Sequence, residues 1–135
     1  MAELSDKNTQ EDMENRIIDL IASGAGGRLI VFKPENSDKN LIVEKKGGYK
    51  KKAICLNVYG EKEIRQLAGK KDIRGEENFY LVFVHFDFVK QNISDAFWVI
   101  PSLDLDKLPE ENDFSKFLTN KKDFIRFLIE AFEKK

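Results

Sequence analysis

The sequence predicts a single α/β (α+β) domain in which a helix from each end of the chain packs on a mixed five-stranded sheet. Three observations lead to this expectation: an amphipathic stripe near the N-terminus, five short runs of β-forming residues, and a second amphipathic stripe near the C-terminus. The length of 135 residues and the 41% apolar content suit one domain with one core. We expect a frayed segment over residues 1–8 and the folded domain over residues 9–135.

Both terminal helices are predicted from capping residues and apolar spacing. The first is expected to begin near Thr9, which can cap it, and to end at Gly24. Spacings of three and four place its apolar residues on one face: Met13, Ile17, Leu20 and Ile21. The last helix is expected to begin after Asn120, with the stripe Phe124, Phe127, Leu128, Ala131 and Phe132. Phe127 and Leu128 lie in the middle of this stripe, so we expect them to anchor the helix against the sheet.

The strands are predicted from runs rich in β-branched and aromatic residues: 29–33, 41–45, 52–58, 79–88 and 96–100. We expect the first three to form an antiparallel meander, because Gly47 and Gly48 supply a hairpin bend between the second and third. The fourth run is apolar without alternation, which is typical of a central strand buried on both faces. A short helix is expected over residues 61–68.

Composition and charge exclude several classes of function. The 23 basic and 24 acidic residues nearly cancel, so there is no overall attraction to nucleic acid or to a membrane. A single Cys forms no internal disulfide, and one Cys with one His is too few for a zinc site. There is no apolar signal region and no run long enough to span a membrane. We expect a cytoplasmic protein without contact with a membrane.

The stretch Asn40–Tyr59 reads as two strands joined by a Gly-Gly turn, after a helix and a first strand. This order resembles the core of the PD-(D/E)XK nuclease-like (restriction-endonuclease-like) superfamily, and the resemblance covers roughly residues 9–102. In active members the second strand opens with Asp and the third carries Glu-x-Lys or Gln-x-Lys. The corresponding positions here hold Asn40, Asn57 and Tyr59.

The resemblance implies a fold without its usual chemistry. Such nucleases hold Mg²⁺ with two carboxylates and use a Lys charge at the attacked phosphate. Asn side chains offer only neutral oxygens, and a Tyr phenol is neutral at pH 7. The expected function is therefore that of a pseudoenzyme, a non-catalytic binding or assembly module, with no catalytic residues, no metal and no cofactor.

Two alternatives stay open at this stage. One is a divergent metal-dependent nuclease with a migrated active site, which would use Mg²⁺ and substitute carboxylates from Glu14, Asp38 and Glu61. Glu14 lies on the first helix, where the resemblance places a Glu that faces the site. The other alternative is an unrelated α/β protein-interaction domain. A general-base pair of His85 and Asp87 has no convincing nucleophile, because Cys55 is typical of a small buried apolar residue.

A basic hairpin is the one candidate binding surface. Five lysines within eight residues surround one Tyr: Lys45, Lys46, Tyr49, Lys50, Lys51 and Lys52. Lysines contact phosphates without reading sequence, and an aromatic ring can stack on a base. One interpretation is weak nucleic-acid contact through this hairpin; the interpretation that we prefer is a solvated turn whose lysines discourage aggregation through the sheet edge. If the lysines serve only as a solvated turn, a protein partner or a second copy of the chain becomes the expected ligand.

Overall fold

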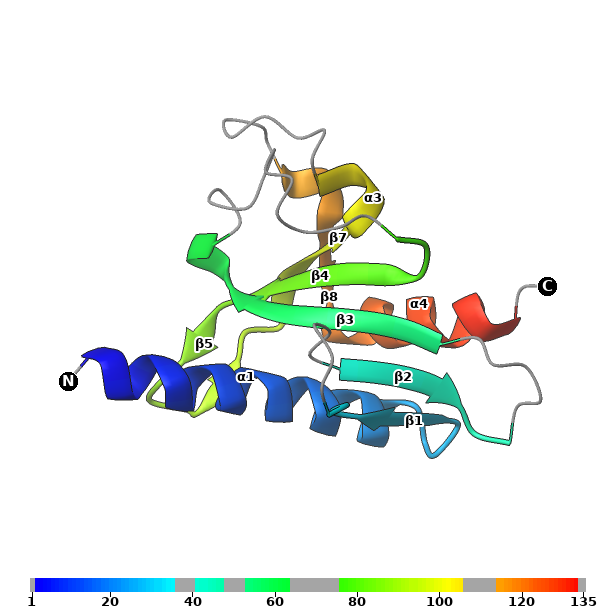
Figure 1. The fold of residues 1–135 in the computed structure, drawn as a ribbon, viewed down its shortest axis with the longest axis horizontal. Helices are drawn as coiled ribbons and strands as arrows, with labels where there is room; N and C mark the ends of the chain where they lie inside the picture. Colours follow the sequence, from blue (N-terminus) through cyan, green and yellow to red (C-terminus); the bar gives the residue numbers. More distant parts are fainter. Residues whose placement is uncertain (1, 36–40, 48–52, 64–75, 106–113, 134–135) are drawn as a thin grey trace.

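A mixed six-stranded sheet forms the middle of the molecule, in the strand order β1–β2–β3–β4–β7–β8 (Figure 1). The computed structural model describes residues 2–35, 41–47, 53–63, 76–105 and 114–133. The strands of this sheet are β1 (Leu29–Phe32), β2 (Leu41–Lys45), β3 (Ala53–Gly60), β4 (Phe79–Val84), β7 (Ala96–Pro101) and β8 (Leu118–Asn120). A separate hairpin pairs β5 (Phe86–Asp87) with β6 (Asn92–Ile93). The helices are α1 (Ala2–Gly24), α3 (Ser102–Leu105) and α4 (Lys121–Glu133), with 3₁₀ turns η1 (Glu61–Glu63) and η2 (Phe114–Phe117).

The predicted meander is confirmed. β1 and β2 are antiparallel, and so are β2 and β3. The residue after Lys46 is Gly47, with a φ of 75° that suits glycine at the start of the turn. β3 then runs parallel to β4, the one parallel pair among the described strands, and β7 closes antiparallel on the other side of β4. β4 is therefore a central strand, as its apolar run predicts.

Four features differ from the expectation. The apolar run does not continue as one strand, because His85 leaves the ladder and residues 86–87 pair with β6 instead. A sixth strand, β8, pairs with the first half of β7; its three residues are too few to carry a β pattern. The first helix begins at Ala2 instead of near Thr9. Of the helix predicted over residues 61–68, the described part is only the 3₁₀ turn η1.

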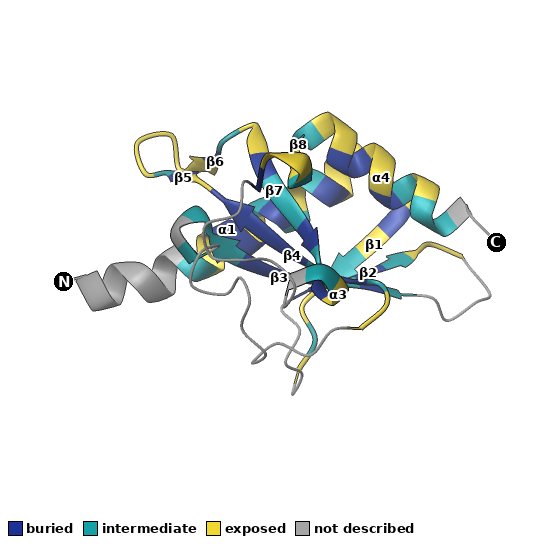
Figure 2. Ribbon diagram, turned by 90° about the horizontal axis from the view of Figure 1, so that it is seen from above, coloured by how far each residue is buried: buried dark blue, intermediate teal, exposed yellow. Residues whose placement is uncertain are grey.

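One face of the sheet, called here the helix face, is covered by α1 and α4 (Figure 2). Alternate residues of the strands point to this face and are fully buried: Leu41, Val43, Ile54, Leu56, Val58 and Val82. Ile17 and Ile21 of α1 and Leu128 of α4 pack on them with no exposed surface. Leu128 thus lies where its helical spacing predicts.

Phe127 does not anchor the helix in the core, contrary to the expectation. It is 36% exposed and meets Tyr80 of β4 edge-on, with ring centres 5.2 Å apart. Its place in the core is taken by Phe124 and Ile125, which are buried. The buried face of α4 is slightly rotated around the helix axis relative to the stripe predicted from spacing. It includes Ile125, which the stripe leaves out, and it excludes Phe127.

The opposite face of the sheet, called here the second face, has a smaller apolar cluster. It consists of Leu81, Phe83, Ile100 and Phe114, with Tyr59, Trp98 and Phe117 partly buried beside them. Toward β1 this face is more open, since Ile30 and Phe32 are 44% and 39% exposed. None of the helices in the described part of the chain is both long and apolar enough to cross a membrane.

Candidate functional site

Asn57 and Tyr59, two of the three positions singled out by the resemblance, lie on the second face of β3. Asn57 is in register with Leu81, and Tyr59 with Phe83. The Asn57 Nδ2 donates a hydrogen bond of 3.3 Å to the Tyr59 hydroxyl, and the Tyr59 ring stacks on Phe83 with centres 5.5 Å apart. Asn57 is only 7% exposed. Asn40 and Asp38 lie outside the described residues.

The surroundings of these side chains are apolar and their own groups are neutral. Leu81 and Phe83 are fully buried beside them on β4. The side-chain amide of Asn57 donates one of its hydrogen bonds to the phenol oxygen of Tyr59, so each side chain meets part of the hydrogen-bonding requirement of the other. This arrangement fits a packed sheet face better than a cradle for a divalent cation, which prefers anionic oxygen ligands and bound water.

Glu14 is not part of the same constellation. It lies on the buried face of α1, which packs against the helix face of β3, whereas Asn57 and Tyr59 point to the second face. Glu14 is 3% exposed. Its Oε1 lies 2.7 Å from Lys33 Nζ, an ion pair, and accepts no other hydrogen bond among the described residues.

A small network holds the Glu14 carboxylate in place. The Gln10 Nε2 donates to Glu14 Oε2 at 3.0 Å and to the carbonyl oxygen of Val58 at 2.7 Å. The hydrogen bond and the negative charge of Glu14 raise the pKa of the Lys33 ammonium. A buried carboxylate with a cation and an amide as partners has the features of a structural clamp between α1, β1 and β3.

Glu61 meets His85 at the ends of the two parallel strands. The last register pair of β3 and β4 is Gly60 with Val84. Glu61 directly follows β3, and His85 directly follows β4. The Glu61 Oε1 lies 2.7 Å from His85 Nδ1. Both side chains are accessible to solvent. The carboxyl ends of neighbouring parallel strands are a common place for ligand sites in α/β proteins.

The pair of His85 and Asp87, which was considered from the sequence and set aside, is not formed among the described residues. The Asp87 Oδ1 instead accepts hydrogen bonds from the amides of Val89 and Lys90, at 2.9 Å and 3.2 Å, and closes the β5–β6 turn. Cys55 is in register with Phe79 at the far end of β4 from His85, roughly 20 Å away at 3.3 Å per residue. Within the described ranges, no group of three or more His, Cys, Asp or Glu side chains could hold a metal ion.

The basic hairpin is described only in part. Lys45 and Lys46 are exposed, and Tyr49, Lys50, Lys51 and Lys52 lie outside the described residues. Arg28 stands beside the two lysines, because Leu29 is in register with Lys45 and the Lys46 amide donates to the Arg28 carbonyl at 3.0 Å. The three cations line a pocket of about 230 Å³, together with Gly27, Leu29, Ile129 and Phe132.

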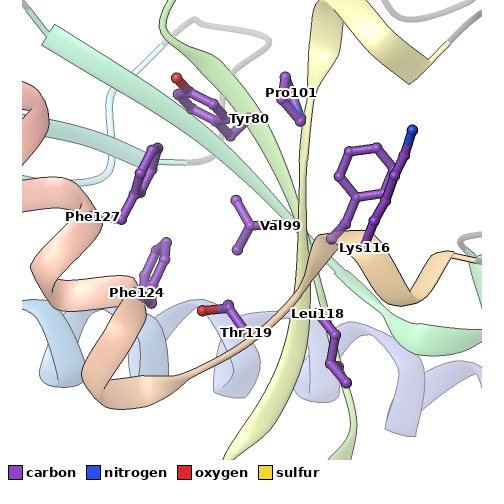
Figure 3. A pocket seen from close by; sticks show the side chains of 9 residues that line it. Tyr80, Val99, Pro101, Lys116, Leu118, Thr119, Phe124 and Phe127 are labelled. Carbon is purple, nitrogen blue, oxygen red and sulfur yellow. The ribbon is translucent and has the colours of Figure 1, made fainter.

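A second pocket, of about 280 Å³, lies between α4 and the β4–β7 part of the sheet (Figure 3). Its walls come from Tyr80, Val99, Pro101, Lys116, Phe117, Leu118, Thr119, Phe124 and Phe127. Sequence reasoning did not find it, because its residues come from four separate segments. The only signal was Phe127, an apolar residue of the predicted stripe that the core does not use.

Comparison with known proteins finds no matching family model, no matching curated protein and no matching solved structure. The nuclease-like resemblance therefore continues to depend on the order of elements and on the positions of Asn57 and Tyr59. Three contacts were missed by sequence reasoning: Lys33 with Glu14, His85 with Glu61, and Arg28 with the lysines. Each joins residues far apart in the chain, and only the strand pairing brings them together.

Proposed function

We propose that this chain is a non-catalytic nuclease-like domain that serves as a binding or assembly module. The observation that carries the proposal is the hydrogen bond between Asn57 and Tyr59, two neutral side chains at the positions where an active relative would have a carboxylate and a Lys. The element order supports it, since α1 is followed by a three-stranded antiparallel meander and, after further chain, by β4.

The charges around β3 argue against phosphodiester cleavage there. Mg²⁺-assisted hydrolysis needs a metal held by anionic ligands and a group that orients water at the phosphate. Asn57 and Tyr59 supply neither charge, and Tyr59 is stacked on Phe83. Glu14 faces away, and its charge is already offset by Lys33. We therefore expect neither a metal nor another cofactor at this position.

A cleavage assay tests this proposal. Plasmid and single-stranded DNA and RNA are incubated with the protein in Mg²⁺ or Mn²⁺, and the expected result is no metal-dependent cleavage above a buffer control. Cleavage that co-purifies with the protein and is lost in Asp38→Ala or Glu61→Gln would contradict it. Lys122→Gln, an exposed residue on α4, is the matched control and should leave either result unchanged.

The second candidate function is the divergent nuclease with a migrated site. It is favoured by the Glu61–His85 pair, because a His with a carboxylate on Nδ1 can accept a proton from water at Nε2. This candidate requires Mg²⁺ and a further carboxylate near the pair, for which Asp38 is the sequence candidate. Loss of cleavage in both Glu61→Gln and His85→Gln would establish it over the non-catalytic reading.

The ligand that the module best suits is the phosphate backbone of nucleic acid. Arg28, Lys45 and Lys46 line one pocket, and no ion pair neutralises their side chains among the described residues. Arg and Lys recognise phosphate by charge, and three such contacts predict a log–log salt slope of about −2 to −3 on duplex DNA. Binding should be weak and independent of sequence.

These cations could also serve only to offset the carbonyl charge at the end of α1, because the Arg28 amide donates to Ala25 in the turn after that helix. Fluorescence anisotropy of a labelled duplex across a salt series separates the two roles. The double variant Arg28→Ala with Lys46→Ala should weaken binding and flatten the salt slope by about two. Unchanged binding with a lowered free energy of unfolding would assign the cations to the helix end and favour a protein partner.

A further inference from the structure

We propose that the pocket between α4 and the β4–β7 part of the sheet binds a small carboxylate-bearing aromatic compound. The pocket is independent of the proposed function. Its β4 and β7 residues, Tyr80 and Val99, point to the helix face, whereas Asn57 and Tyr59 point to the second face. The proposal rests on three properties of the cavity: its size, its aromatic walls and the polar groups at its rim.

The size limits the ligand to a single ring with a short arm. The cavity measures about 280 Å³, at the lower limit of the range of roughly 300–1,000 Å³ usual for small-molecule sites. A dinucleotide is too large for this space. A single six-membered ring with an acetate arm fits within it.

The walls favour a flat apolar ring. Phe124 is 1% exposed and is fixed edge-on against Phe97, with ring centres 5.3 Å apart. Phe127 and Tyr80 meet edge-on and form the neighbouring wall (Figure 3). Aromatic side chains bind a further ring by edge and offset contacts. Phe127 leaves more than a third of its surface exposed beside this cavity, so a ring placed there would bury apolar surface that the protein itself leaves open.

The rim favours an anionic group on that ring. In the view of Figure 3 the Tyr80 hydroxyl and the Lys116 ammonium lie on opposite sides of the pocket, with Pro101 between them. The Lys116 Nζ lies 5.0 Å from the centre of the Phe117 ring, and no described acidic side chain forms an ion pair with it. The Tyr80 phenol is protonated at neutral pH, since burial raises its pKa further above the usual 10.0, and it can act as a hydrogen-bond donor. We assign the anionic arm to the Lys116 side of the pocket, because Lys116 carries the positive charge among the residues that line it.

The test uses two probes that differ only in charge: phenylacetate and the uncharged phenylacetamide. Each is titrated into the ¹⁵N-labelled full chain while the backbone amide resonances are recorded. We expect phenylacetate to shift amides of residues 99, 116–119 and 124–127, and to bind about tenfold more tightly than the amide, because its arm forms a charge-assisted hydrogen bond. Shifts scattered over the surface, or equal affinities of the two probes, would overturn the proposal.

Two variants and a matched control sharpen this test. Lys116→Gln should weaken phenylacetate about tenfold, to the level of the amide, and leave the amide unaffected. Lys122→Gln removes an exposed Lys outside the pocket and should change neither affinity. Val99→Phe should fill the cavity and abolish binding of both probes, with the amide resonances of α1 unchanged as evidence of folding. If Lys116→Gln and Lys122→Gln behave alike, Lys116 does not bind the carboxylate and the proposal fails.

Discussion

The two faces of the sheet differ in what their side chains do, and β3 contributes to both. On the helix face, Ile54, Leu56 and Val58 are fully buried under α1 and α4. On the second face, the alternate residues of β3 include Asn57 and Tyr59, which hydrogen-bond to each other beside a smaller apolar cluster. One strand thus carries the main packing surface on one side and the Asn57–Tyr59 pair on the other. The difference indicates that side chains on the second face of β3 can vary without loss of the main core, because that core lies on the helix face.

The largest expected effect comes from truncating the helix face. Phe124→Ala should lower the free energy of unfolding by about 3–5 kcal/mol, because it removes a buried ring that packs on Phe97. Phe127→Ala, on the same helix, should cost only about 1 kcal/mol, since that ring is partly exposed at a pocket wall. Urea denaturation of both variants measures the contrast. Equal losses would mean that α4 packs on the sheet through both rings.

The next effect concerns the clamp that joins α1 to β1. Lys33→Met removes the cation from the buried Glu14 carboxylate and should cost about 1–3 kcal/mol, reduced from the full penalty because the Lys33 side chain is 56% exposed and Gln10 still donates. Lys46 forms no ion pair with a carboxylate among the described residues, so Lys46→Met serves as the control. A loss that is the same in both variants would mean that the ion pair contributes nothing beyond the general effect of a lost surface charge.

A smaller effect is expected on the second face. Tyr59→Phe keeps the ring on Phe83 and removes the hydroxyl that accepts from Asn57, so it should cost about 0.5–1.5 kcal/mol. The comparison with Phe124→Ala is made under the same denaturant conditions. A cost of about 4 kcal/mol, close to that of a core truncation, would place the motif positions in the main core and remove the distinction between the two faces.

The smallest effect is a dependence on alkaline pH. Burial raises the pKa of Tyr80 above its usual 10.0, and Glu14 raises that of Lys33 above 10.5. The folded state holds both protons more tightly than the unfolded chain, so their stabilisation is complete below the usual pKa values and is lost as the pH rises through the raised ones. Urea midpoints measured from pH 8 to about pH 11 should fall less steeply for Tyr80→Phe than for the natural chain. If the urea midpoints of the two proteins fall in parallel, the Tyr80 phenol has the same pKa in the folded and the unfolded state.

Much of the fold follows from the sequence because its signals are local. Spacing along α1 predicts Ile17 and Ile21 in the core, and alternation along β3 separates Leu56 from Asn57. The Gly47–Gly48 bend predicts the second hairpin of the meander. The strand β8 has three residues and no pattern of its own, so only its pairing with β7 defines it. Ile125 is likewise buried because α1 approaches it: a Cβ atom at Gly24 would lie only 2.9 Å from Ile125 Cγ1.

The candidate site is less predictable than the fold, because its contacts depend on register. The sequence predicts that Asn57 and Tyr59 share a face, which the strand period requires. It does not predict that Glu14 faces the other way, because the rotation of α1 on the sheet is set by packing. His85 pairs with Glu61 and not with Asp87 because the chain leaves the ladder after Val84. That break has no signal in an apolar run such as Phe79–Phe88.

The most direct test of the central claim is whether a divalent metal binds near β3. Mn²⁺ is titrated into the ¹⁵N-labelled chain, and paramagnetic broadening reports any bound ion through the amides of residues 57–61 and 84–86. The account predicts no saturable broadening there, because Asn57 and Tyr59 offer no anionic ligand and Glu14 faces away. Saturable broadening at these amides that disappears in Glu61→Gln would contradict it and indicate an active metal site at the ends of the parallel strands.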